Sequence, residues 1–549
     1  MDKFFSHFDG DSRTLQFIGE WGCRVYDERE LIQMYIHLII SALFPIYIGA
    51  HASLRRPPSA AEPKKSKAAK DEDDDEVDVE STVEGLSPSD AILFPVLAGL
   101  TLTGLYFLIK WIQDPKLLNK ILNYYFSLIG VFGVGKIAAD SLNVATTFVF
   151  PSVWSSRGKT YMIDPLLAQQ VTGKAKPRGV QLHHSFTDKT NPFPGLLSSV
   201  QFPAFVNKKL WTLRALLRNH WIFRGYIHGI VNGKSKVQIN DMIGLFIGIA
   251  TIIAYNVSGK AWWLLNIIGF GFCYGTLQLM SPTTFWTGSM VLAGLFVYDI
   301  VMVFYTPMMI TVATSLEAPI KLVFPGPGRG SMLGLGDVVL PGIMMALALR
   351  FDLYLHYLRH PTRKDEKKAP YHEATGKWGE RFWTWGSKDE PTIADGARFK
   401  KVYFKASLIG YVLGLVTTLV VLNIFKHGQP ALFYLVPTVL GSLWGTAFLR
   451  GDFKLMWGYT EDGSLDQDED DKEKQNAGDS KEKHSEVSRG ADGNKSSTDR
   501  GLESSHTSSD QGKDGSAVVA KKDEHAQHVF LFSLTAPKQG KKAVLSDKS

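Results

Sequence analysis

The stretch Ser331–Phe351, SMLGLGDVVLPGIMMALALRF, is apolar enough and long enough to form a membrane-spanning helix, yet it carries an aspartate near its beginning. A charged side chain at the centre of a membrane helix costs about 2.5–3.5 kcal/mol on insertion scales. Such a residue is retained where it has a partner or a chemical task. Asp337 is therefore expected to have a partner elsewhere in the chain or a chemical task.

Apolar blocks of similar length recur along the chain. A mean hydropathy of −0.03 hides them, because it averages them with long charged stretches. A helix that crosses the hydrocarbon core needs about 20 apolar residues. The sequence predicts an all-α polytopic membrane protein with nine transmembrane helices, the first acting as an uncleaved signal. The predicted spans are 31–50, 91–113, 121–150, 240–257, 261–280, 285–313, 333–356, 402–425 and 430–449.

The spans and loops predict four regions. These are a lumenal N-terminus (1–30), an N-terminal membrane region (31–257) with cytosolic loops 51–90 and 151–239, a catalytic membrane region (258–450) with a cytosolic loop 357–401, and a cytosolic tail (451–549). Residues 56–90 and the chain from about Thr460 onward are rich in charged and small residues, apart from the apolar island HVFLFSL at 528–534. Such compositions cannot bury enough apolar surface to fold alone, so we expect disorder in both.

The distribution of lysine and arginine predicts the orientation of the chain. The loops after predicted spans one, three and seven are rich in these residues, and the loops after spans two, four, six and eight hold few. Basic loops remain on the cytosolic side of a membrane. Nine spans place all the basic loops on one side, which predicts a lumenal N-terminus and a cytosolic tail.

Two consecutive predicted spans each contain an aspartate. Asp299 lies fourteen residues after Phe285, and Asp337 lies thirteen residues before Arg350. At a rise of about 1.5 Å per residue, these offsets correspond to depths of roughly 21 Å and 20 Å from the same side. Antiparallel helices should therefore bring the two carboxyl groups to one level.

Two carboxyl groups in contact cannot both ionise readily, so they share a proton and titrate in two separated steps. This state suits peptide hydrolysis, because the ionised group can take a proton from water while the protonated group donates to the scissile carbonyl. Gly334 and Gly336, which precede Asp337, would let backbone or substrate approach closely and would permit non-helical backbone angles.

The motifs around these residues resemble a known family. YD in one span, GLGD in the next and QPALFYLVP (429–437) at the start of the last are similar to the intramembrane aspartyl proteases of the presenilin and signal peptide peptidase group, and EAPIKLVFP (317–325) favours the signal peptide peptidase branch. The resemblance covers mainly residues 240–450. It implies a presenilin-like fold and a catalytic pair formed by Asp299 and Asp337. The substrate-binding residues that it implies are Tyr298, Gly334, Leu335, Gly336, Gln429, Pro430, Ala431 and Leu432.

The function implied is hydrolysis of peptide bonds within transmembrane helices, most often remnant signal peptides and type II-oriented spans, in the endoplasmic reticulum membrane. The implied partners are the lipid bilayer and transmembrane peptides, with a homo-oligomer or a quality-control complex left open. No metal, organic cofactor or nucleic acid is expected. Two alternatives use the same residues differently: a proton- or cation-coupled transporter or channel, since paired acids also mark ion paths, and a membrane adaptor in a degradation complex.

Two other features have simpler interpretations. Lys136 and Asp140 are four residues apart in the third predicted span, a spacing that predicts a helical ion pair without a catalytic role. Cys23 and Cys273 are too few and too far apart for a disulfide framework.

Overall fold

The computed structural model of the chain describes part of its sequence. The described residues are 28–61, 84–112, 115–157, 159–165, 167–172, 185–186, 189–227, 231–316, 320–326, 330–359, 368–385, 398–425, 429–461 and 530–535. They form two compact units. The larger unit comprises Met1–Trp221, Lys236–Asp462 and Ala536–Ser549, and the smaller one comprises Ile222–Ser235 and Gly463–Thr535.

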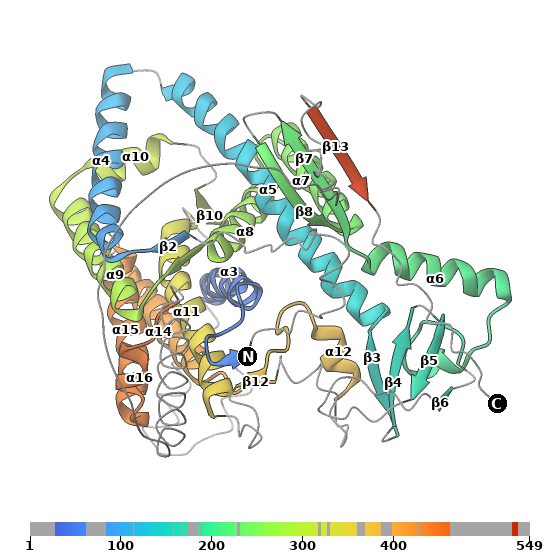
Figure 1. Cartoon of the computed structure of the whole chain (residues 1–549). Helices are drawn as coiled ribbons and strands as arrows, with labels where there is room; N and C mark the ends of the chain where they lie inside the picture. The colour runs from blue at the N-terminus through green and yellow to red at the C-terminus, as the bar shows by residue number, and fades with distance from the viewer. Residues whose placement is uncertain are drawn as a thin grey trace, which may run out of the picture. The chain divides into compact units, whose positions relative to one another are not determined.

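Among the described residues, eight helices are long and apolar enough to cross a membrane. They are α3 (Arg29–Ala52), α4 (Pro88–Ile112), α5 (Pro115–Val149), α7 (Ile239–Val257), α9 (Phe285–Ile300) with its π-helical continuation η3 (Val301–Tyr305), α11 (Leu335–Arg359), α14 (Val402–Phe425) and α15 (Ala431–Arg450) (Figure 1). All eight belong to the larger unit. They coincide with the predicted spans one to four and six to nine, and they confirm a helical polytopic membrane protein.

The fifth predicted span, 261–280, forms helix α8 (Trp262–Leu279), which is not one of those eight. The helix contacts α3, α5 and α11 and buries Asn266 along with its apolar residues. Asn266 exchanges hydrogen bonds with the backbone of Val323, donating at 2.9 Å and accepting at 2.8 Å. A helix enclosed by other helices can carry such polar groups, because it needs less lipid-facing apolar surface.

The sixth predicted span, 285–313, is not one continuous helix. The α-helix ends at Ile300, continues as the π-helix η3 and is followed by a separate helix, α10 (Met308–Ser315). Pro307 lies at the start of α10. Proline has no backbone N–H and is disfavoured inside a helix, which accounts for the break. The change to the π-helix begins at Val301, two residues after Asp299.

Helix α11 forms the centre of the membrane region. It contacts α3, α8, α9, α14 and α15, and 83% of the residues in its most apolar 18-residue segment are buried. This explains why the helix is apolar on all sides instead of on one face. It extends to Arg359, three residues beyond the predicted end of the span at 356. Arg350 is only 3% exposed.

Short strands tie the loops of the larger unit to its helices. β1 (Ala60–Ala61) pairs with β12 (Ala369–Pro370), β2 (Glu84–Leu86) with β9 (Met280–Pro282), and β10 (Lys321–Phe324) with β11 (Ser331–Gly334). β1 and β2 are the ends of the loop 56–90 that we expected to be disordered, and both are ordered. The loop's interior, 62–83, lies outside the described residues.

The predicted loop 151–239 contains regular structure. Strands β3 (Val153–Ser156), β4 (Lys159–Asp164), β5 (Gln169–Thr172) and β6 (Ser185–Phe186) form an antiparallel sheet in chain order, and η2 (Gly195–Ser199) and α6 (Ala204–Arg218) follow. α12 (Trp378–Trp383), from the loop 357–401, packs on α5 and β3.

The tail begins later than the sequence suggests. After α15, the short helix α16 (Phe453–Trp457) leads to Thr460, which forms a β-bridge with Thr284, and to Glu461, which is buried. Thr460 and Glu461 are therefore part of the fold. In the smaller unit, the apolar island contributes strand β13 (Phe530–Thr535) to an antiparallel sheet with β7 (Trp221–Ile227) and β8 (Val231–Val237). The rest of the predicted tail lies outside the described residues.

Candidate active site

Asp299 lies near the end of α9, where the helix meets the start of α15. Its side chain is buried, with 3% of the residue exposed. The backbone N–H of Leu432, at the start of α15, donates a hydrogen bond of 3.1 Å to Asp299 Oδ2. The first N–H groups of a helix have no partner within the helix, so they are available to a carboxylate. This bond fixes one oxygen of Asp299 and joins two of the motifs singled out in the sequence.

Asp337 lies in the first turn of α11, directly after strand β11. The residue is half-buried. The N–H of Leu335 bonds to the carbonyl of Ile320 at 3.0 Å, so the β10–β11 hairpin fixes the position at which α11 begins. The backbone carbonyl of Asp337 accepts a hydrogen bond of 3.2 Å from the hydroxyl of Tyr411, on α14.

The two aspartates are brought together. α9 and α11 are in contact, which places Asp299 and Asp337 on neighbouring helices. None of the ion pairs found among the described residues includes either carboxyl group. A buried pair of carboxyl groups without a cation is unfavourable for stability and retains one proton between them.

The two glycines of the GLGD motif have different surroundings. A methyl group at Gly334 would lie 3.3 Å from Asp337 Oδ2 and would crowd the carboxyl group. At Gly336, which is exposed, the nearest atom would be Leu340 Cδ1 at 3.9 Å. Neither residue has a positive φ angle. Space beside the carboxyl group, and not an unusual backbone angle, is therefore what Gly334 provides here.

The PAL segment forms the first turn of α15. Pro430 is the residue that caps the helix, with φ −67° and ψ 111°, and it is buried. Ala431 begins the helix, and Leu432 is buried as well as bonded to Asp299. Gln429, just before, is half-buried, and its Oε1 lies 3.5 Å from the hydroxyl of Tyr434.

Tyr298 precedes Asp299 on α9 and is half-buried. Its ring faces α4, because a methyl group at Gly99 would lie 3.8 Å from the ring. All ten residues predicted for the site thus belong to α9, to α11 with strand β11, or to the start of α15 with the residues before it. These helices contact one another.

Sequence reasoning missed Tyr411. The residue is fully buried, and its hydroxyl donates a hydrogen bond to Asp337 O. The sequence signal for this residue is a tyrosine inside an apolar span, because a buried tyrosine hydroxyl usually has a hydrogen-bond partner on another segment. The sequence does not show which of the other spans supplies that partner.

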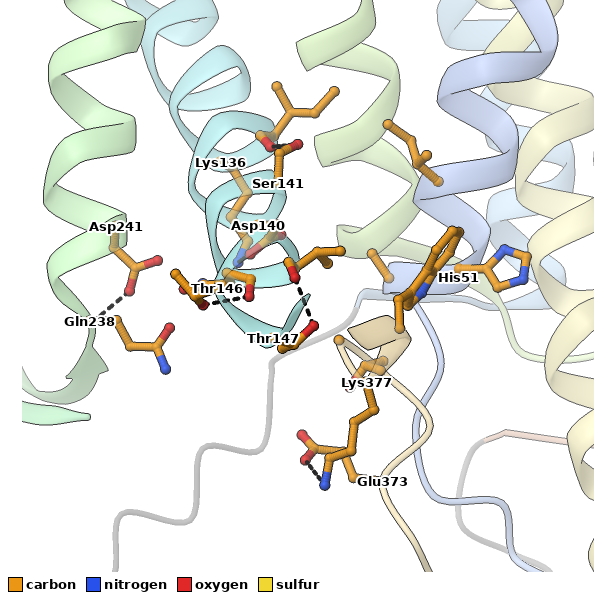
Figure 2. A pocket seen from close by; sticks show the side chains of 18 of the residues that line it. His51, Lys136, Asp140, Ser141, Thr146, Thr147, Gln238, Asp241, Glu373 and Lys377 are labelled. Carbon is orange, nitrogen blue, oxygen red and sulfur yellow. Dashed lines mark hydrogen bonds and ion pairs between the residues drawn. The ribbon is translucent and has the colours of Figure 1, made fainter. Parts of the chain in front are cut away.

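A large cavity lies elsewhere in the described part of the chain. It has a volume of about 690 Å³ and is lined by residues of α3, α5, α7, α8 and the segment 373–380. Figure 2 shows its polar side chains, among them Lys136 and Asp140 on α5 and Gln238 and Asp241 at the start of α7. Lys136 Nζ lies 2.9 Å from Asp140 Oδ1, which confirms the predicted ion pair. Asp140 also accepts a bond of 2.7 Å from the hydroxyl of Tyr274.

Comparison with known proteins is consistent with this geometry. Residues 78–463 match the family model described as signal peptide peptidase. Signal peptide peptidase of Mus musculus is 30% identical over 440 residues, covering 79% of this chain and 84% of the mouse protein. The Homo sapiens protein is 29% identical with the same coverage. A probable intramembrane protease of Saccharomyces cerevisiae is 28% identical over 401 residues, which cover 68% of this chain and 60% of the yeast protein.

Proposed function

The chain belongs to the signal peptide peptidase family of intramembrane aspartic proteases, and from this premise we propose that Asp299 and Asp337 are its catalytic pair. The observation that carries the proposal is that the two helices with these carboxyl groups contact each other, that Asp299 is bonded to the PAL segment, and that no ion pair among the described residues includes either group. Family membership favours proteolysis over the transporter and adaptor alternatives.

The proposed reaction is hydrolysis by water. The ionised carboxyl group removes a proton from a water molecule, whose oxygen then forms a bond to the scissile carbonyl carbon. The protonated carboxyl group donates its proton to the carbonyl oxygen. Collapse of the tetrahedral intermediate breaks the C–N bond, and the nitrogen leaves as an amine after receiving a proton from the pair. The products are a new carboxyl end and a new amino end.

The roles of the other residues follow from their positions. Leu432 N–H orients Asp299, and Gly334 leaves space beside Asp337. Strand β11 carries extended backbone up to the first turn of α11. A substrate helix has all its backbone groups paired internally, so it must unwind locally before a carbonyl can be attacked. Gly334–Gly336 and Gln429–Leu432 would contact the unwound segment.

The proposed substrates are remnant signal peptides and type II-oriented spans in the endoplasmic reticulum membrane, with the N-terminus of the protease lumenal and its C-terminus cytosolic. The names of the relatives and the basic loops support this orientation. A peptide must cross the catalytic pair in one direction, because the geometry of attack by a water molecule held at fixed carboxyl groups is chiral.

The test uses purified protein and two test spans with the same core sequence, inserted in opposite orientations by moving their flanking lysines. We expect cleavage of the span whose N-terminus is cytosolic. Asp337→Asn should abolish cleavage. Asp352→Asn is the matched control, because Asp352 is another buried carboxyl group of α11 but accepts its bonds from the backbone N–H groups of Tyr403 and Phe404. Preference for the opposite span would overturn the orientation, and full activity of Asp337→Asn would overturn the catalytic assignment.

A further inference from the structure

A third carboxylate, Glu461, lies buried at the other ends of the two helices that carry the catalytic pair. Its side chain is 5% exposed. Oε1 accepts bonds from Arg350 Nε at 2.7 Å and from the Tyr459 hydroxyl at 2.9 Å. Oε2 accepts a bond of 2.8 Å from the Ser281 hydroxyl and another from the guanidinium of Arg55. Both oxygens are therefore saturated by donors from four residues.

These donors come from elements that lead directly to the active site. Arg350 is part of α11, and Ser281 is in strand β9, which immediately precedes α9. Arg350 Nη2 also donates a bond of 2.5 Å to the Ser281 hydroxyl. The backbone N–H of Glu461 donates to the carbonyl of Thr283 at 2.9 Å. Arg55, which follows α3, is the fourth attachment. Glu461 and Arg350 thus join the start of α9 to α11.

The geometry of a helix carries this constraint to the catalytic pair. Asp299 is fourteen residues from the start of α9, and Asp337 is thirteen residues from Arg350. At about 1.5 Å per residue, both carboxyl groups lie roughly 20 Å from the Glu461 cluster. A helix resists axial compression, so a shift of one helix along its axis at the cluster displaces its aspartate by a similar amount. A misplacement of about 1 Å can cost on the order of 100-fold in rate.

We propose that Glu461 is a positioning residue that sets the axial register of α9 against α11 and thereby aligns Asp299 with Asp337. The proposal rests on the catalytic roles proposed above. It assigns the first residues after α16 to the catalytic machinery, although in the sequence they look like the start of a low-complexity tail.

The test compares three variants of the full-length protein with the wild type on one peptide substrate in detergent. Glu461→Gln keeps the shape of the side chain but removes its charge, and Glu461→Asp keeps the charge. Glu380→Gln is the matched control, because Glu380 is 1% exposed and accepts a bond of 3.1 Å from Arg218, but lies on α12, which packs on α5. It removes a buried ion pair that is not attached to α9 or α11.

We expect Glu461→Gln to lower kcat by about 10- to 100-fold while KM changes by less than roughly twofold, since the substrate contacts are unaffected. Glu461→Asp should recover most of that loss. Glu380→Gln should lower the melting temperature and leave kcat unchanged. Equal kcat in Glu461→Gln and the wild type, or an equal loss in Glu380→Gln, would overturn the proposal.

Two further variants keep the test decisive. If Glu461→Gln does not fold, Ser281→Ala removes only the hydroxyl that bridges Arg350 and Glu461, and it should lower kcat by about 3- to 10-fold at unchanged KM, because it loses fewer bonds. An unchanged kcat there would also overturn the proposal. Asp337→Asn, measured in parallel, distinguishes a failure of the catalytic assignment from a failure of the positioning role. If Asp337→Asn is active, the catalytic assignment has failed. If it is inactive while Glu461→Gln has a normal kcat, only the positioning role has failed.

Discussion

The two ends of α11 carry buried charges with opposite surroundings. In the first turn lies Asp337, on the helix that contacts α9 and therefore neighbours Asp299. Asp299 accepts one backbone N–H, from Leu432, and no ion pair among the described residues includes either carboxyl group. Near the other end, Arg350 meets Glu461, whose oxygens accept bonds from two guanidinium groups and two hydroxyls. A paired charge can hold elements together, whereas an unpaired one destabilises the fold. The difference agrees with the proposed roles, in which the aspartates perform the chemistry and the Glu461 cluster holds the helices.

The two charge clusters should affect the stability of the fold in opposite ways. Active sites commonly contain groups that the fold would be more stable without. The aspartate pair should therefore be dispensable for folding and required for activity. The Glu461 cluster should be required for stability as well as for alignment.

The largest effect is expected at the aspartate pair. Asp299→Ala, Asp337→Ala and either Asp→Asn change should each abolish cleavage, because one carboxyl group cannot carry out both proton transfers. The double variant should be no worse than the single ones, since residues that act as a unit are not additive. Melting temperatures should stay equal to that of the wild type or rise. Measurable turnover by any single variant would contradict the catalytic role of the pair. A marked fall in melting temperature would contradict the expectation that the pair is dispensable for folding.

The next effect concerns the start of α15. Pro430→Leu should weaken substrate binding, raising KM by about tenfold, because proline fixes the backbone angle of the residue that presents Leu432 N–H to Asp299. Pro437→Leu is the matched control, since Pro437 lies on an exposed face of the same helix. The KM reports the effect on substrate binding, and the melting temperature reports the effect on folding. An unfolded Pro430→Leu protein beside a folded control would make Pro430 a structural residue first.

Much of this site could be predicted from the sequence. The matched depths of Asp299 and Asp337 predicted that neighbouring helices bring these residues to one level, and the family resemblance implied that the QPAL segment belongs to the same site. In the structure, α9, α11 and α15 contact one another. These predictions depend on local patterns and on spacing along single helices.

The remaining features depend on contacts between distant segments. The break after Ile300 was missed because Val301–Tyr305 is as apolar as the helix before it, so hydropathy does not register the change to a π-helix. α8 was predicted as a span, but its burial among other helices was not. Glu461 lies 111 residues from Arg350 in the chain. It was assigned to the tail because the composition around it is polar.

A smaller effect should appear in the pH dependence of stability. Burial alone would raise the pKa of Glu461, but Arg350 and Arg55 together with their hydrogen bonds hold that pKa below its usual range. A carboxyl group with a lowered folded-state pKa contributes stability that is fully present above its unfolded pKa of about 4.3 and is lost as the pH falls through the folded value.

The measurement is the difference in melting temperature between the wild type and Glu461→Gln. We expect a difference of several degrees at pH 6–7, because breaking a buried pair costs about 3–5 kcal/mol. The difference should be constant down to about pH 4.5 and should shrink below that. A difference that grows as the solution becomes more acidic would contradict the assignment of a charged Glu461 in the folded protein.

The smallest effect is expected from the tail. Removing all residues after Gly463 should leave kcat and KM of the purified enzyme within roughly twofold of the full-length values. The deletion removes strand β13, which pairs with β7 in the smaller unit, and that unit contains no residue of the candidate site. Removing four more residues, so that the chain ends at Tyr459, also deletes Thr460 and Glu461, and it should reproduce the kcat loss of Glu461→Gln. Cleavage of one peptide by the two truncated enzymes measures both. A large loss already in the longer form would place a functional element in the tail, whereas equal activity of both forms would remove Glu461 from the alignment of the catalytic helices.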